Sequence, residues 1–194
     1  WCGSHPPVPP KPAFFLFYVE QEVWTHPRTK ELLAKFPQAK VVHIANYKDV
    51  CCRKHQNVSQ QHQAQKLILA AKHGNLVYEG APVCQSFGNE YFYYTSCMMN
   101  CIFDCEYCYL KGMYPSANLV IFVNLEDYFA QVEQILNNHP LYLCISYDAD
   151  LLALEHITGY AREWCDFAEK HENLNLEIRT KCAGVQLAGQ LRPV

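Results

Sequence analysis

Four cysteines stand within twelve residues, Cys97, Cys101, Cys105 and Cys108, directly after an aromatic run over residues 91–95 that predicts a strand. The spacing Cys101-x3-Cys105-x2-Cys108 places three thiols on one short loop. Such a loop can wrap a compact cluster and bring a thiolate to each of three irons. A four-iron cluster held by three thiolates keeps one iron open to a small molecule. Cys97 is not needed for this frame and is left without a role.

Two other metal or redox readings of the loop stay open. Structural zinc sites usually pair two knuckles separated by a dozen or more residues, whereas here one continuous run carries all four thiols. The pair Cys105-Glu106-Tyr107-Cys108 has the spacing of a redox-active dithiol, but it gives Cys101 no function. A packed loop with chance cysteines is disfavoured by the density of thiols.

The composition limits the cellular environment and the classes of ligand that we expect for the chain. It has eleven cysteines, an odd number, and no secretory signal at its start, so a disulfide framework is not expected. We expect a reducing, cytoplasmic environment, with the scattered cysteines packed in the core. No apolar stretch approaches the roughly 18 residues of a membrane helix. The formal net charge of -3 argues against a general polyanion binder, although a local basic channel remains open.

The hydrophobic pattern predicts an α/β chain. A proline-rich leader over residues 1–13 is followed by alternating elements. Strands are predicted at residues 14–19, 41–45, 91–95, 119–123, 141–145 and 174–180. Helices are predicted from a cap at Thr25 to about residue 36, over residues 57–73 ending at Gly74, over residues 124–136 with Asn124 as cap, and over residues 151–171 with Gly159 as a weak point.

In the second half the order strand, helix, strand, helix, strand favours parallel strands with crossover helices. Asp148 and Asp150 follow one of these strands, where Asp150 either polarises a site or caps the next helix.

The segment Cys101-Ile102-Phe103-Asp104-Cys105-Glu106-Tyr107-Cys108-Tyr109-Leu110 resembles the signature loop of the radical S-adenosylmethionine enzymes. Among these it is most similar to the spore photoproduct lyase family, in which C-x3-C-x-Y-C-Y-L recurs. Weaker matches extend the resemblance over roughly residues 14–182, including Gln60-Gln61, Gln65-Lys66, Val123-Asn124 and Thr180-Lys181.

The resemblance implies a [4Fe-4S] cluster on Cys101, Cys105 and Cys108, with S-adenosylmethionine chelating the fourth iron. One electron would cleave this cofactor to a 5′-deoxyadenosyl radical, which in the family abstracts hydrogen from a thymine dimer in DNA. Tyr107 matches a tyrosine beside the adenosyl group, and Lys181 matches a lysine that contacts the cofactor's carboxylate. Tyr109 matches a tyrosine of the radical relay.

The chain departs from the family pattern after the strand predicted at residues 141–145. The family's hydrogen-donating cysteine falls on Tyr147, which is a candidate replacement or an ordinary half-buried tyrosine. Cys144 lies three residues earlier and points to the opposite face of a regular strand. A cofactor-binding serine of the family falls on Ala149, and Ser146 is the nearby hydroxyl that could substitute for it.

These observations together predict a partial radical SAM (β/α) barrel over residues 89–194, preceded by a small N-terminal α/β segment over residues 14–88. Only 94 residues follow position 100, so we expect a truncated chain that holds the first half of the barrel.

The function expected is that of a radical SAM carbon–carbon lyase that repairs thymine lesions in DNA, with a flavodoxin or ferredoxin as electron donor. Two alternatives remain: a radical SAM enzyme with a non-DNA substrate, and a non-catalytic zinc or iron-sulfur binding module.

Overall fold

The computed structural model describes residues 14–81, 83–103 and 105–182. The predicted leader over residues 1–13 lies outside this part of the chain. The strands are β1 (Leu16–Glu20), β2 (Lys40–Ile44), β3 (Leu67–Ala70), β4 (Val77–Glu79), β5 (Phe92–Thr95), β6 (Met98–Met99), β7 (Leu119–Phe122), β8 (Leu141–Cys144) and β9 (Leu174–Glu177). The helices are α1 (Pro27–Ala34), α2 (Lys48–Cys51), α3 (Val58–Gln63), α4 (Leu110–Met113), α5 (Leu125–Leu136), α6 (Glu155–Thr158) and α7 (Tyr160–Ala168), with 3-10 turns η1 (Gln21–Val23) and η2 (Leu152–Leu154).

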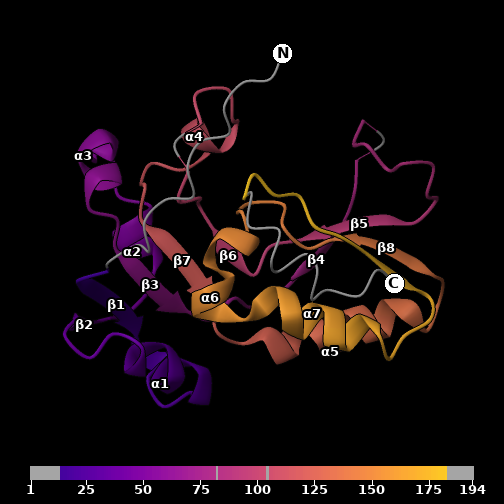
Figure 1. Ribbon diagram of the computed structural model, residues 1–194, viewed down its shortest axis with the longest axis horizontal. Coiled ribbons are helices and arrows are strands. Elements are labelled where there is room, and N and C mark those ends of the chain that lie inside the picture. Colours follow the sequence, from indigo (N-terminus) through magenta and orange to yellow (C-terminus); the bar gives the residue numbers. More distant parts are fainter. Residues whose placement is uncertain (1–13, 82, 104, 183–194) are drawn as a thin grey trace.

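The strands form two sheets (Figure 1). One has the order β2-β1-β3-β7-β6, in which the first four strands are parallel and β6 runs antiparallel to β7. The other has the order β4-β5-β8-β9, with β5, β8 and β9 parallel. The chain passes from β5 in one sheet to β6 in the other through Ser96 and Cys97 alone. The expected parallel strands and crossover helices are therefore present, but β7 and β8 belong to different sheets.

The core is continuous across both sheets. Helices α5 and α7 lie together against the four-stranded sheet (Figure 1), where the ring of Phe129 packs edge-on to Trp164 at 4.8 Å and stacks on Phe167 at 4.4 Å. Helix α1 is joined to the end of β7 because Arg28 Nε donates to the carbonyl of Val123 at 3.0 Å. The guanidinium of Arg28 also pairs with Glu163 of α7.

The helix predicted over residues 57–73 is wrong. Only residues 58–63 are helical, and Leu67–Ala70 form β3, which is buried on both faces between β1 and β7. A short, wholly apolar run fits a buried strand as well as a buried helix, so periodicity cannot distinguish them. Gly74 adopts a left-handed φ of 82° in the turn that follows, not at a helix end.

Helix boundaries differ from the predictions in three smaller ways. The cap of α1 is His26, whose Nδ1 accepts from Arg28 N at 3.2 Å, rather than Thr25. Asn124 is in the cap position of α5, but its side chain bonds the backbone of Lys72 instead. The helix predicted over residues 151–171 is interrupted at Gly159, which has a φ of 70° and is the weak point that the sequence predicts.

The five-stranded sheet combines strands from the predicted N-terminal segment (residues 14–88) and from the predicted barrel segment (residues 89–194), because β3 pairs with β7. Within the described residues, no helix is long and apolar enough to cross a membrane.

Leu69 tests the assignment of β3, because its side chain is fully buried at the centre of the sheet. We expect Leu69→Ala to lower the free energy of unfolding by about 2–5 kcal/mol, as for other buried leucines. Leu33→Ala, at a partly buried position on α1, is the matched control and should cost less. Urea unfolding followed by circular dichroism measures both, and equal small losses would contradict a central strand at residue 69.

Candidate functional site

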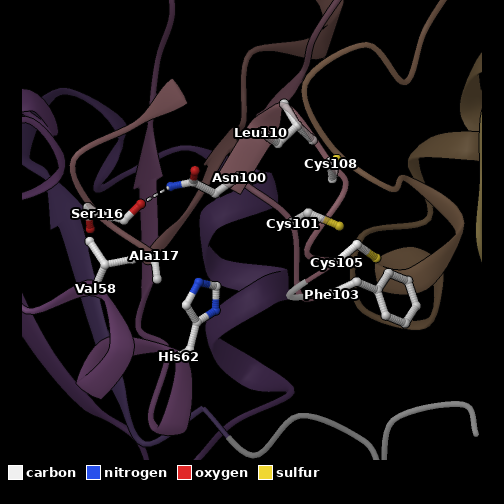
Figure 2. Close-up of a pocket in the computed structure, with 10 residues that line it drawn as sticks. All are labelled: Val58, His62, Asn100, Cys101, Phe103, Cys105, Cys108, Leu110, Ser116 and Ala117. Carbon is white, nitrogen blue, oxygen red and sulfur yellow. Dashed lines mark hydrogen bonds between the residues drawn. The ribbon is translucent and has the colours of Figure 1, made fainter. Parts of the chain in front are cut away.

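The base of the cysteine loop is fastened by side-chain amides. Asn100, which is buried and has a left-handed φ of 67°, donates from Nδ2 to the carbonyl of Ser116 at 2.8 Å (Figure 2). The same Nδ2 donates to the carbonyl of Asn118 at 2.7 Å. Gln65 Nε2 donates to the carbonyls of Cys101 at 3.2 Å and Ala117 at 3.0 Å. The two ends of the loop are thereby held together, and the loop begins and ends at a fixed place beside β7.

Gln61 adds a third amide from α3. Its Oε1 accepts from the backbone N–H of Ala117 at 2.8 Å and from the hydroxyl of Ser116 at 3.0 Å. Buried backbone groups need such partners when no strand neighbour supplies them. Gln61 and Gln65 belong to the weak family matches in the sequence, whereas no sequence pattern indicates a role for Asn100.

The three predicted cluster ligands lie on this loop and line one cavity. Cys101, Cys105 and Cys108 are free and partly buried, and Figure 2 shows the sulfur atoms of Cys101 and Cys105 on the same side of the loop. The N–H of Cys108 donates to the carbonyl of Cys105 at 3.1 Å, so a tight turn brings these two residues together. Burial raises the pKa of the Cys101 thiol to about 11.

In the described part of the chain, no three His, Cys, Asp or Glu side chains are grouped to hold a single metal ion. An iron-sulfur cluster needs a different arrangement of ligands, because each thiolate binds a separate iron. Three free thiols on one loop, all bordering the same space, are a donor set that fits a cluster with one open corner. Cys97 takes no part in this cavity: it is 1% exposed within the core.

A second, larger cavity with an open volume of about 650 Å³ lies on the other side of the thiols. It is bordered by the cysteine loop, by the segment after β8 and by the segment after β9. Its lining residues are Cys101, Phe103, Cys105, Cys108, Tyr109, Leu110, Ser146, Tyr147, Ala149, Asp150, Arg179, Thr180 and Lys181. The structure thus brings together the three thiols and four other residues that the sequence singled out, Tyr109, Ser146, Tyr147 and Lys181.

Tyr107 is not among the residues that line either cavity of the loop. Its side chain is 80% exposed, and the Lys181 ammonium lies 3.6 Å from its ring centroid. Contact with Tyr107 raises the pKa of Lys181 above its ordinary value, which already makes this lysine a cation at neutral pH. The pair therefore forms a cationic rim beside Cys105 and Cys108.

Asp150 fastens the segment that carries Lys181. Its carboxylate accepts from the Lys181 N–H at 2.6 Å, from the Thr180 hydroxyl at 2.8 Å and from the Ala153 N–H at 3.1 Å. The last bond reaches the first turn of η2, whose cap residue is Leu151 rather than Asp150, and the other two place residues 180 and 181 at the edge of the cavity. The Ser146 hydroxyl also holds the segment that carries Lys181, since it accepts from the Arg179 N–H at 2.6 Å.

The two predicted catalytic tyrosines are in direct contact. The Tyr109 hydroxyl donates to the carbonyl of Tyr147 at 2.7 Å, and their ring centroids are 6.4 Å apart. Burial raises the pKa of Tyr109, so it keeps its phenolic hydrogen at neutral pH. The ring of Tyr147 stacks on Tyr94 of β5 at 4.2 Å. Cys144, by contrast, is fully buried and does not line the larger cavity.

The family model described as spore photoproduct lyase matches residues 13–190. The chain belongs to the spore photoproduct lyase family. No curated protein matches the sequence.

Solved structures of spore photoproduct lyase share the fold of this chain. A cysteine-to-serine mutant is 23% identical, with a TM-score of 0.76, and the match covers 93% of this chain and 54% of that one. A double mutant with bound AdoMet and dinucleoside spore photoproduct is 22% identical, with a TM-score of 0.77 and the same coverage. A complex with dinucleoside spore photoproduct is 22% identical, with a TM-score of 0.76. The chain thus spans about half the length of these structures.

Replacement of Asp150 tests how the rim of the cavity is held. We expect Asp150→Ala to lower the free energy of unfolding by about 1.5–3 kcal/mol, because buried N–H and O–H donors lose a charged acceptor. Asp166→Ala, at an exposed position on α7, is the control and should be nearly neutral. Thermal unfolding measures both, and an unchanged Asp150→Ala protein would show that the three hydrogen bonds contribute nothing.

Proposed function

We propose that this chain carries the cluster and cofactor site of a radical SAM lyase that repairs thymine lesions in DNA. The observation that supports this most directly is the convergence of Cys101, Cys105, Cys108 and Lys181 on one cavity in a member of the spore photoproduct lyase family. When bound, a [4Fe-4S] cluster supplies the electron that turns S-adenosylmethionine into a source of a hydrogen-abstracting 5′-deoxyadenosyl radical.

The residues of the chain would divide the work as follows. The three thiols would hold the cluster by thiolate bonds. Lys181, at the rim of the cavity, would contact the carboxylate of the cofactor, and Tyr107 beside it would contact the adenosyl part. Ser146 lines the cavity together with Ala149, and its hydroxyl accepts from the Arg179 N–H and also bonds the thiol of Cys144. Tyr109 and Tyr147, the candidate catalytic tyrosines, line the same cavity.

Residues 89–182 contain every one of these site residues. We propose that they form the catalytic part, and that residues 14–88 support it through β3 and the amides of Gln61 and Gln65. The ten cysteines within the described residues are all free thiols. This supports a reducing, cytoplasmic setting, in which a flavodoxin or ferredoxin would deliver the electron.

The cluster assignment is tested by anaerobic reconstitution with iron and sulfide, followed by metal analysis and optical spectra. We expect about four irons per chain, as for a [4Fe-4S] centre. Alanine at Cys101, Cys105 or Cys108 should remove most of the iron, because each thiolate binds a separate corner. Cys52→Ala, which changes an exposed free thiol, is the matched control and should leave the iron content unchanged. One zinc and no iron in the reconstituted protein would support a zinc-binding module instead.

The substrate assignment is tested with the reduced, reconstituted protein, S-adenosylmethionine and dinucleoside spore photoproduct. We expect 5′-deoxyadenosine together with repaired dithymidine, both measured by liquid chromatography and mass spectrometry. Lys181→Met should weaken binding of S-adenosylmethionine in equilibrium dialysis, since the rim loses its cation. Formation of 5′-deoxyadenosine without any repair would favour a radical SAM enzyme with another substrate.

A further inference from the structure

A histidine from outside the cysteine loop borders the three thiols. His62 belongs to α3 and lines the smaller cavity, which has an open volume of about 350 Å³ and is bordered also by all three loop cysteines. Figure 2 shows its imidazole ring in the space between Ala117 and Phe103. Lys181 lines the larger cavity instead. The thiols therefore have His62 in one of their two cavities and the proposed cofactor site in the other.

Helix α3 is fixed against the base of the cysteine loop, and this determines where His62 lies. Gln61, the preceding residue, accepts from the Ala117 N–H at 2.8 Å and from the Ser116 hydroxyl at 3.0 Å. Its Nε2 donates to Gln56 Oε1 at 2.7 Å. His62 thus follows directly on a side chain whose two ends are both engaged, so its place beside the loop is set by the fold.

The other side chains of the smaller cavity, besides the thiols, use their polar hydrogens at the base of the loop. Asn100 Nδ2 donates to the carbonyls of Ser116 and Asn118, and the Ser116 hydroxyl donates to Gln61. The rest of the lining is hydrocarbon, from Val58, Phe103, Leu110 and Ala117. Among the described residues of this cavity, His62 is therefore the side chain that can bring an N–H group to the thiols. Its ring has two nitrogens, so a partner at one leaves the other for a second bond.

An N–H donor at this place acts on the charge of a bound cluster. A four-iron cluster with three thiolate ligands is anionic, and its reduced form carries one more negative charge. Hydrogen bonds to the sulfur atoms are one of the factors that set the reduction potential of such clusters. A donor stabilises the reduced form more strongly, because hydrogen bonds strengthen with the charge of the acceptor. It therefore raises the reduction potential.

We propose that His62 donates an N–H hydrogen bond to a sulfur atom of the cluster, from outside the set of iron ligands, and thereby makes the cluster easier to reduce. This role rests on the proposed function, because it requires the cluster on the three loop cysteines. It also gives residues 14–88 a side chain that contacts the cluster, in addition to the support that they supply.

Spectroelectrochemical titration of the reconstituted protein tests this role without substrate and without S-adenosylmethionine. We expect His62→Leu to shift the midpoint potential of the cluster to a more negative value. At a fixed solution potential the ratio of reduced to oxidised cluster should fall about tenfold, the size expected for one hydrogen bond to a charged group. His62→Gln, which keeps an N–H donor, should restore most of the potential. His73→Leu, at an exposed position after β3, is the matched control and should change nothing. An unchanged potential in His62→Leu would overturn the role.

The second test detects the histidine directly in the unmodified protein. Protein labelled with ¹⁵N-histidine is reconstituted and reduced, and pulsed electron paramagnetic resonance records the nitrogen nuclei that couple to the cluster. We expect a weak ¹⁵N coupling that is lost in His62→Gln and kept in His73→Gln. The absence of any ¹⁵N coupling, or a strong coupling of the kind that a directly bound imidazole gives, would contradict a hydrogen bond from His62.

Failure of this role and failure of the proposed function have different signatures. A protein that takes up zinc but no iron on reconstitution would count against the proposed function, and against His62 with it. A full iron content, with the same potential in the unmodified protein and in His62→Leu, would leave the proposed function intact and remove the role of His62 alone.

Discussion

The amide clasp formed by Asn100, Gln61 and Gln65 is the constraint on which the candidate site depends. A loop that must offer three thiols to a cluster cannot also satisfy its own backbone by regular pairing, so its polar groups need partners from elsewhere. Three amide side chains supply them at the one place where the loop leaves and rejoins the five-stranded sheet. The base of the loop is thereby held in a fixed position beside β7.

The carboxylate of Asp150 has the corresponding role on the opposite wall. It holds residues 180 and 181 by backbone and hydroxyl donors, so that the side chain of Lys181 is left for the cavity. The electrostatic pattern follows from this division of work. The Lys181 cation lies at the rim, and Tyr109 and Tyr147, which are uncharged at neutral pH, line the cavity.

The sequence was sufficient to predict the three loop thiols and most of the strands, because short local patterns determine both. It failed at β3, where Leu67, Ile68, Leu69 and Ala70 are buried on both faces and carry no periodicity. Asn100 was missed for a different reason. Its partners lie 16 to 18 residues away in the chain, and only the paired strands show that these residues meet. The place of Ser146 beside Arg179 likewise depends on the register of β8 against β9.

The passage of the chain from β5 to β6 through Ser96 and Cys97 means that the two walls of the larger cavity are borne by different sheets. The thiols extend from the five-stranded sheet, whereas Ser146, Tyr147 and Lys181 extend from the four-stranded one. The shape of the larger cavity therefore depends on how the two sheets pack against each other through their common core. The edge-on contact of Trp164 with Phe129, which joins α7 to α5, is part of this packing although neither residue lines the cavity.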